Sequence, residues 1–310
     1  MKLYQLIQTK TEYWASEEKK KTQSVVGNLI KYIEKGKLRE PQIEAINIYF
    51  WLKFVGNNQK LSSIIKQGLL YDDEQAKTYE NYYTFGQDYV TQFINQFAQD
   101  NGLKKLSKKL VGDPRGLRIK WEDVLEKLLH NYEYPNYLFS LPMGAGKTFL
   151  MACFIYLDLY FSKLFKNDKR FARNFVIFAP QATKTAILPA LQTIKNFDPE
   201  WVLPKAEADR IKQVIQIEIL DALSSKRKDK LQGNNPNLEK VNRITQTKDF
   251  GLVFITNAEK VVLERYSDED KLLVDPRSLL YDEKKASEVI KYNDLREKLS
   301  KIPYLCIILD

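Results

Sequence analysis

The chain has 310 residues and carries 49 Lys and Arg against 40 Asp and Glu, which gives a formal net charge of +9. This length provides ample core for one large or two ordinary domains, and the mild basic excess fits a polyanionic partner without identifying one. The absence of an apolar run of 18 residues, the polar first 21 residues and the single His, His130, argue against a membrane span, a secretory leader, a His-based metal site and a His-dependent triad.

Residues 1–55 are predicted to be mostly helical. Over 24–35, four apolar residues recur at the spacing of one helix face: Val25, Leu29, Ile30 and Ile33. Gly36 follows as a turn. Pro41 then takes the first position of a second helix, which is predicted to run to about Phe54.

Residues 56–120 contain no recognisable motif and are predicted to form helices. Seven aromatic residues gather there: Tyr79, Tyr82, Tyr83, Phe85, Tyr89, Phe93 and Phe97. Their helical spacing favours a core stripe over a base-stacking platform. A basic run follows, with only Asp113 against it: Lys104, Lys105, Lys108, Lys109, Arg115, Arg118 and Lys120. This run either contacts phosphate groups or forms a solvated surface.

Residues 121–310 alternate short apolar runs with helical runs. The strand-like runs are 137–141, 174–179, 213–219, 251–256 and 304–309. Short runs rich in Val, Ile and Phe that are separated by helices predict an α/β fold with a mostly parallel sheet covered on both faces. Two polar stretches, 224–247 and 264–300, are interpreted as excursions from this sheet.

Residues 141–148, Leu-Pro-Met-Gly-Ala-Gly-Lys-Thr, match the end of the phosphate-binding pattern G-x-x-x-x-G-K-[ST], with Leu141 in place of the first Gly. The two glycines allow backbone N–H groups to face phosphate oxygens, and the following helix adds its N-terminal N–H groups and dipole. The apolar run before the loop and the helix predicted after it are the context that such a loop requires. We therefore interpret these residues as a phosphate-binding loop rather than a chance Gly-rich turn.

The chain contains two cysteines, Cys153 in the helix after the loop and Cys306 in the last strand-like run. Both stand among apolar residues and lie far apart in the sequence. We interpret them as reduced, buried thiols of a cytoplasmic protein, and not as a disulfide or a metal-binding pair.

The order of these motifs resembles the first motor domain of superfamily 2 helicases and translocases of the DEAD/DEAH type. It is most similar to the helicase subunit of type III restriction enzymes and related phage-defence proteins. The resemblance covers about 120–310 and, before that, 38–46. It implies a RecA-like P-loop NTPase domain over 121–310, incomplete at its C-terminus, which follows a helical N-terminal region over 1–55 and an inserted helical segment over 56–120.

The resemblance also implies an ATP and Mg²⁺ site. Gln42, within Leu38-Arg-Glu-Pro-Gln-Ile-Glu-Ala-Ile46, would read the adenine edge, although an ordinary helix start explains the same residues. The loop residues would hold the phosphates: Met143, Gly144, Ala145, Gly146, Lys147 and Thr148. Lys147 would reach the β and γ phosphates, and Thr148 and Asp310 would hold the Mg²⁺, with Lys147 and Asp310 as the catalytic residues.

Two further segments resemble motifs that contact a nucleic-acid backbone. The first is Phe178-Ala-Pro180 with the helix after it, where Thr183, Lys184 and Thr185 are the candidates. The second is Phe254-Ile-Thr-Asn257, where Thr256 and Asn257 are the candidates. For both segments, a strand end followed by a helix cap remains an equal alternative.

The resemblance therefore predicts an ATP-dependent DNA helicase or translocase that works in the cytoplasm on double-stranded DNA, with a modification or specificity subunit as a possible partner. In this family a Glu follows the Asp at position 310, and a second motor domain supplies an arginine finger. We expect these groups to lie beyond residue 310, so that the 310 residues alone are inactive in turnover. The alternatives are a nucleotide- or DNA-binding fragment without activity, and another P-loop enzyme such as a kinase.

Overall fold

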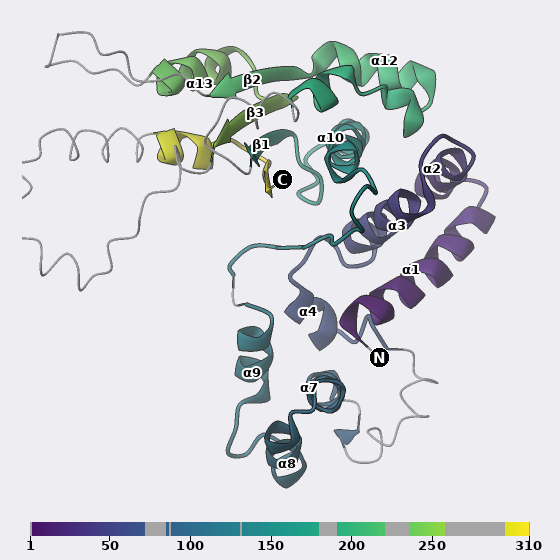
Figure 1. The fold of residues 1–310 in the computed structure, drawn as a ribbon, viewed down its shortest axis with the longest axis vertical. Coiled ribbons are helices and arrows are strands. Elements are labelled where there is room, and N and C mark those ends of the chain that lie inside the picture. Colours follow the sequence, from purple (N-terminus) through teal and green to yellow (C-terminus); the bar gives the residue numbers. More distant parts are fainter. Residues whose placement is uncertain are drawn as a thin grey trace, which may run out of the picture. The chain divides into compact units, whose positions relative to one another are not determined.

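The computed structural model describes residues 2–71, 85–86, 88–130, 132–179, 191–220, 236–257 and 295–309. They form two compact units, residues 1–145 and residues 146–310 (Figure 1). Unit 1 is helical and unit 2 contains a parallel sheet, so the chain as a whole mixes helix and sheet as predicted. None of the described helices is long and apolar enough to cross a bilayer.

The described helices of unit 1 follow one another along the chain: α1 (Leu3–Lys20), α2 (Val25–Glu34), α3 (Glu40–Phe54), α4 (Leu61–Lys66), α7 (Tyr89–Asp100), α8 (Lys104–Gly112) and α9 (Trp121–Leu128). Local chemistry sets several of their starts. Ser24 Oγ accepts the Gly27 N–H at 3.0 Å, and Asp88 Oδ1 accepts the Val90 N–H at 3.2 Å. Both contacts satisfy a donor that the first turn of a helix leaves unpaired.

The core of unit 1 takes side chains from both the predicted N-terminal region and the 56–120 segment. Helix α3 is buried on nearly every side, as expected of a helix that is apolar all round. Its Trp51 joins one apolar cluster with Ile64 of α4, Phe93 of α7 and Leu125 of α9. Phe93 also stacks on Phe97, with ring centroids 6.3 Å apart, as the core interpretation predicts. Tyr79, Tyr82 and Tyr83 lie outside the described residues.

Unit 2 begins with α10 (Lys147–Leu164), which leads into the sheet. The other elements are β1 (Asn174–Ala179), the 3₁₀ turn η1 (Pro199–Trp201), α12 (Lys205–Val214), β2 (Gln216–Leu220), α13 (Pro236–Thr247), β3 (Leu252–Asn257) and β4 (Leu305–Leu309). The strands pair in the order β2-β3-β1-β4, and all three pairings are parallel. The two central strands, β1 and β3, are buried along their whole length.

One buried side chain joins the starts of three strands. Asn174 Nδ2 donates to the carbonyl of Asp249 at 2.8 Å and to that of Pro303 at 2.9 Å, while its Oδ1 accepts the Leu252 N–H at 3.2 Å. These contacts satisfy groups at the beginning of β1, of β3 and of the segment that leads into β4. Asn174 therefore fixes the relative register of strands that are far apart in the sequence.

The prediction of a strand over 137–141 was wrong for the structure described. This run forms no ladder with other described residues. Its Tyr137 and Phe139 pack instead on the apolar cluster of unit 1, and the Tyr137 hydroxyl donates to the Gln59 carbonyl. Alternate side chains are thus buried against helices, while Leu138 between them is 94% exposed.

The expectation that both cysteines are buried holds for only one of them. Cys153 in α10 is fully buried, and burial raises the pKa of its thiol. Cys306 is half-exposed, because β4 pairs on one side only within the described residues and leaves part of its surface open. Ile307 and Leu309 of the same strand are 59% and 77% exposed.

Candidate nucleotide-binding site

The backbone of the predicted phosphate-binding loop depends on its two glycines. Gly144 and Gly146 both have φ of +79°, in the left-handed region that other residues rarely enter. A Cβ on Gly144 would meet no atom within 4 Å, so conformation rather than space requires Gly at this position. The Ala145 N–H donates to the Pro142 carbonyl at 3.2 Å and closes the turn between them.

The loop leads directly into a long helix. Gly146 is the N-cap of α10, and its carbonyl accepts the Leu150 N–H at 3.0 Å. The first turn of α10 therefore contains Lys147, which is exposed, and Thr148, which is half-buried. No acidic residue lies in this turn, so the N–H groups and the positive end of the helix dipole can attract an anion.

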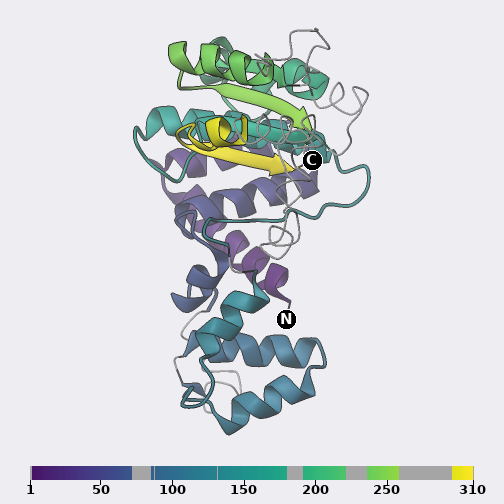
Figure 2. The same cartoon turned by 90° about the vertical axis from the view of Figure 1, so that its left-hand side faces the viewer.

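The position of α10 in unit 2 directs this turn toward the functional edge of the sheet. The Ala172 N–H donates to Asp158 Oδ2 at 3.0 Å, and Phe161 stacks on Phe171 with ring centroids 5.1 Å apart. The second half of α10 thus lies beside the residues that lead into β1. Its first turn points the other way, toward the side where the strands end (Figure 2).

Neighbouring strands end together at that edge. Ala179 at the end of β1 pairs with Asn257 at the end of β3, and Phe178 pairs with Leu309 of β4. Open parallel sheets bind ligands outside the carboxyl ends of their strands. The edge at which β1, β3 and β4 end is therefore where this fold is expected to bind a ligand.

Within unit 1, a hydrogen bond joins the two segments that the sequence analysis assigned to ATP. Arg39 Nη1 donates to the Gly144 carbonyl at 2.9 Å, although 105 positions separate the two residues. Arg39 is the N-cap of α3 and belongs to the predicted adenine-reading segment. The start of α3 and the phosphate-binding loop are thus in direct contact.

Gln42, the predicted adenine reader, is 5% exposed in this structure. Its Oε1 accepts the Arg39 N–H at 3.0 Å, which stabilises the first turn of α3. This contact is the one expected of an ordinary helix start. An adenine edge would have to share or replace this hydrogen bond, so the role of Gln42 in reading adenine stays a prediction.

The candidates for nucleic-acid contact are placed only in part. Thr256 is fully buried, and its hydroxyl donates to the Leu220 carbonyl at 3.0 Å, which ties the ends of β3 and β2 together. Asn257 is 3% exposed. Thr183, Lys184 and Thr185 lie outside the described residues, and so does Asp310.

The donors present fit a Mg²⁺–phosphate group. Thr148 offers a hydroxyl beside the N–H groups of the first turn of α10, and oxygen ligands are those that Mg²⁺ prefers. Asp310 follows β4 directly in the sequence, at the strand end that pairs beside β1. Elsewhere in the described residues, His, Cys, Asp and Glu side chains do not gather in threes around a possible metal position.

Sequence reasoning missed Arg39 as a member of this site. The available signal was a cation two positions before Pro41, in the same segment as Gln42. Its partner is a backbone carbonyl more than a hundred residues away, and no local pattern predicts such a contact.

Comparison of the chain with protein-family models, with curated proteins and with solved structures found no match.

Proposed function

We propose that this chain is the nucleotide-binding part of an ATP-dependent DNA helicase or translocase with a RecA-like motor domain, of the kind found in type III restriction and phage-defence systems. The order of the sequence motifs motivates the family. The geometry of the loop and its helix supports the nucleotide. Double-stranded DNA is the proposed partner.

A single observation carries the nucleotide assignment: Gly144 and Gly146, both left-handed, precede the exposed Lys147 at the first turn of α10. A turn of this kind aims backbone N–H groups at one point, which suits the oxygens of a phosphate group. The contact between Arg39 and Gly144 adds support, because it joins the loop to the segment proposed to receive adenine.

Each residue would have a separate task. The N–H groups after Gly146 would bind β-phosphate oxygens, and the Lys147 ammonium would offset the negative charge of the β and γ phosphates. Thr148 and Asp310 would hold the Mg²⁺, which supplies charge neutralisation on the transferred phosphoryl group. Arg39 would keep the loop in its binding conformation through the Gly144 carbonyl.

The proposed DNA contacts lie on the sheet edge where β1 and β3 end. Thr183, Lys184 and Thr185 follow β1 in the sequence, and Thr256 and Asn257 end β3. Backbone N–H groups, hydroxyls and one ammonium suit phosphate oxygens and carry no preference for base sequence. Nucleotide and DNA would then act on opposite sides of the same strand ends, which is the coupling that a motor requires.

A titration of the 310-residue chain with a fluorescent ATP analogue and Mg²⁺ tests the nucleotide site. We expect saturable binding that Lys147→Ala weakens by at least about tenfold, equivalent to about 1.4 kcal/mol. Lys166→Ala is the matched control, because Lys166 is also exposed and lies just after the end of α10. Equal affinity of the Lys147→Ala chain and the unmodified chain would refute the site.

Addition of duplex DNA separates a motor from other P-loop enzymes. A translocase should bind the nucleotide more tightly, or hydrolyse it faster, when DNA is present. Phosphoryl transfer to a small acceptor that DNA does not affect would instead favour a kinase and contradict the translocase proposal.

A further inference from the structure

A compact part of unit 1 carries most of the net charge of the chain. Residues 104–120 contain seven basic residues: Lys104, Lys105, Lys108, Lys109, Arg115, Arg118 and Lys120. Seven cations minus the carboxylate of Asp113 give +6, which is two thirds of the +9 of all 310 residues. We call helix α8 together with 113–120 the basic surface.

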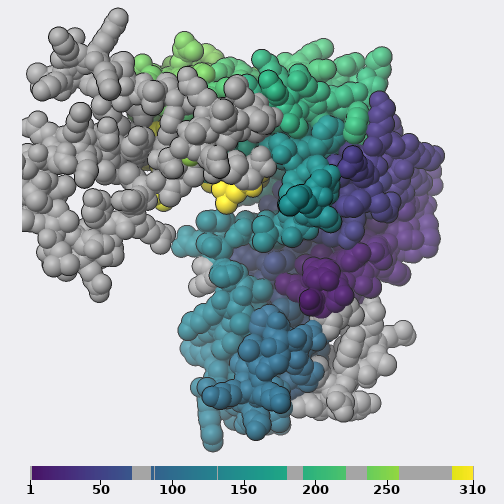
Figure 3. Space-filling view, viewed as in Figure 1, coloured from purple at the N-terminus to yellow at the C-terminus, as the bar shows by residue number. Residues whose placement is uncertain are grey.

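Helix α8 presents its four lysines to solvent. Leu110 is fully buried and Leu106 packs on the same apolar cluster of unit 1. Ser107 Oγ donates to Asn95 Oδ1 of α7 at 3.1 Å, which fixes the rotation of the helix. The exposed lysines therefore gather on the side of α8 away from Leu106 and Leu110. They are Lys104, Lys105, Lys108 and Lys109. Figure 3 shows this blue segment on the surface of unit 1.

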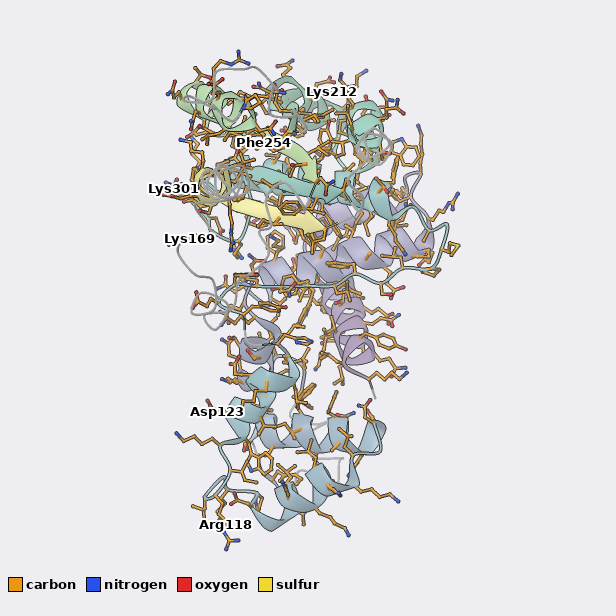
Figure 4. All side chains as sticks on the ribbon, turned by 60° about the vertical axis from the view of Figure 1, so that its left-hand side comes forward. Arg118, Asp123, Lys169, Lys212, Phe254 and Lys301 are labelled. Atoms are coloured by element: carbon orange, nitrogen blue, oxygen red, sulfur yellow. The ribbon has the colours of Figure 1, made fainter. Side chains whose placement is uncertain are left out.

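The loop after α8 is built around Asp113. Its carboxylate accepts the N–H groups of Leu117, Arg118 and Ile119 at 2.8 to 2.9 Å, and the Trp121 indole donates to the Asp113 carbonyl at 2.7 Å. The negative charge is thus used within the loop. Arg115 and Arg118 remain exposed beside α8, and Figure 4 shows Arg118 extending outward from unit 1.

The charge on α8 does not stabilise the helix. Among the residues that the structure describes, none of the seven cations makes an ion pair within 4 Å. Lys104 and Lys108, and likewise Lys105 and Lys109, are like charges at i,i+4, and each pair destabilises a helix by about 0.2–0.5 kcal/mol. The first turn contains lysines and no acidic residue, which also opposes the helix dipole.

Exposed lysines at the end of α1 follow the opposite pattern. Lys20 pairs with Glu17, and Lys21 pairs with Glu18, both at 2.6 Å. The concentration of cations without partners on α8 is therefore particular to this helix. Local features that work against stability are expected at functional sites.

We propose that the basic surface binds the phosphate backbone of nucleic acid, independently of the nucleotide site. Lys104 and Lys109 lie about 7.5 Å apart along the helix axis, which is close to two phosphate steps of about 3.4 Å along one strand. An anionic membrane is disfavoured, because the apolar face of α8 is already packed in the core of unit 1 and cannot enter a bilayer. Glu122 and Asp123 in the first turn of α9 limit the surface on one side.

The test measures binding of the 310-residue chain to a labelled 20-base-pair duplex by fluorescence polarisation, without nucleotide and over a range of salt concentrations. We expect the combined variant Lys104→Ala, Lys105→Ala, Lys108→Ala and Lys109→Ala to weaken binding by about tenfold or more at low salt. The slope of log K against log salt should become less steep by about 2, since each lost phosphate contact changes it by about 0.9.

The matched control removes the same charge from exposed lysines elsewhere: Lys2→Ala, Lys35→Ala, Lys205→Ala and Lys212→Ala. This control should keep the salt slope. Equal losses in the two fourfold variants would show that only net charge matters and would overturn the proposal. So would a chain that sediments with phosphatidylserine vesicles but does not bind the duplex.

A second variant protects the test against a folding artefact. Arg115→Ala with Arg118→Ala changes the loop and leaves α8 intact, and it should weaken duplex binding in the same direction. Thermal unfolding followed by circular dichroism checks that each variant is folded. Repeating the titration with Lys147→Ala keeps the two proposals separate, because loss of the nucleotide site should leave duplex binding at the basic surface unchanged.

Discussion

At the scale of single residues, the candidate site depends on two backbone conformations. Gly144 and Gly146 adopt a φ that costs other residues about 1–2 kcal/mol. Neither glycine is required by a neighbouring atom that the structure shows at Gly144. The need for Gly at position 144 is therefore a need for a particular direction of the backbone N–H groups, which is a property of binding and not of packing.

Gly144→Ala tests this distinction. We expect it to destabilise the fold by about 1 kcal/mol and to weaken nucleotide binding, because relaxation of the strained φ would turn the loop away from the phosphate. Gly102→Ala is the matched control, since Gly102 has φ of +66° and also has no neighbour within 4 Å of an added Cβ. The control should lose similar stability without loss of affinity; an equal loss of affinity in both variants would argue against the loop.

The residue scale also shows what the sequence could reveal of the site. Lys147 and Thr148 were found because their spacing from the glycines is local, and a pattern of eight residues contains it. The contact of Arg39 with Gly144 was not found, because it joins a side chain to a carbonyl 105 positions away. The capping bond of Gln42 was foreseen only as the alternative to adenine recognition.

At the scale of elements, the strands within the sheet were predictable and the segment before the loop was not. The run 174–179 is a strand over its whole predicted length, because it is buried on both faces and rich in Phe, Val and Ile. The run 137–141 has a similar composition, but its Tyr137 and Phe139 are buried by helices. Composition reports that side chains are buried and does not report which element buries them.

The contact between α1 and α2 makes a strong demand on one residue. Gly27 lies so close to α1 that an added Cβ would be 2.1 Å from the Glu18 carbonyl oxygen. We expect Gly27→Ala to destabilise the protein by about 1–3 kcal/mol, although Ala is the better helix former. Gly112→Ala in the last turn of α8 has open space and should be neutral or stabilising. Chemical denaturation of both variants compares them; stabilisation by Gly27→Ala would show that α1 and α2 are not packed as described.

At the scale of the whole molecule, three ion pairs join separate segments through carboxylates. Lys66 bonds Glu126 at 2.9 Å, and this bond lowers the pKa of Glu126. Burial opposes ionisation of Glu18 and Glu218, but hydrogen bonds from Lys21 and from Gln216 and Lys240 keep the pKa of each carboxyl below its ordinary value. These pairs lie in both units, so acid should affect the entire chain.

A lowered carboxyl pKa contributes stability above the ordinary value of 4.5, and that stability is lost as the pH falls through the pKa of the folded state. We therefore expect the unfolding temperature to be nearly constant from pH 7 to pH 5 and to fall below about pH 4.5. Glu126→Gln should lower the stability at pH 7 by up to about 1 kcal/mol and reduce its loss on acidification. Glu239→Gln, at an exposed position of α13, is the control. An identical acid response of the Glu126→Gln and unmodified chains would rule out the pair as a contributor.

The order of strands in the sheet has a consequence for how the protein is made. β1 pairs with β4, and the partners Asn174 and Leu305 are 131 positions apart. At about 5–20 residues per second, a ribosome needs roughly 7 to 26 s to synthesise that interval. During this time one edge of β1 and the donors of Asn174 wait for partners that do not yet exist, and the nascent chain exposes a buried strand to its neighbours on the same messenger. Folding of unit 2 is thus tied to the end of its own translation, and molecular chaperones are expected to occupy the exposed strand in the interval.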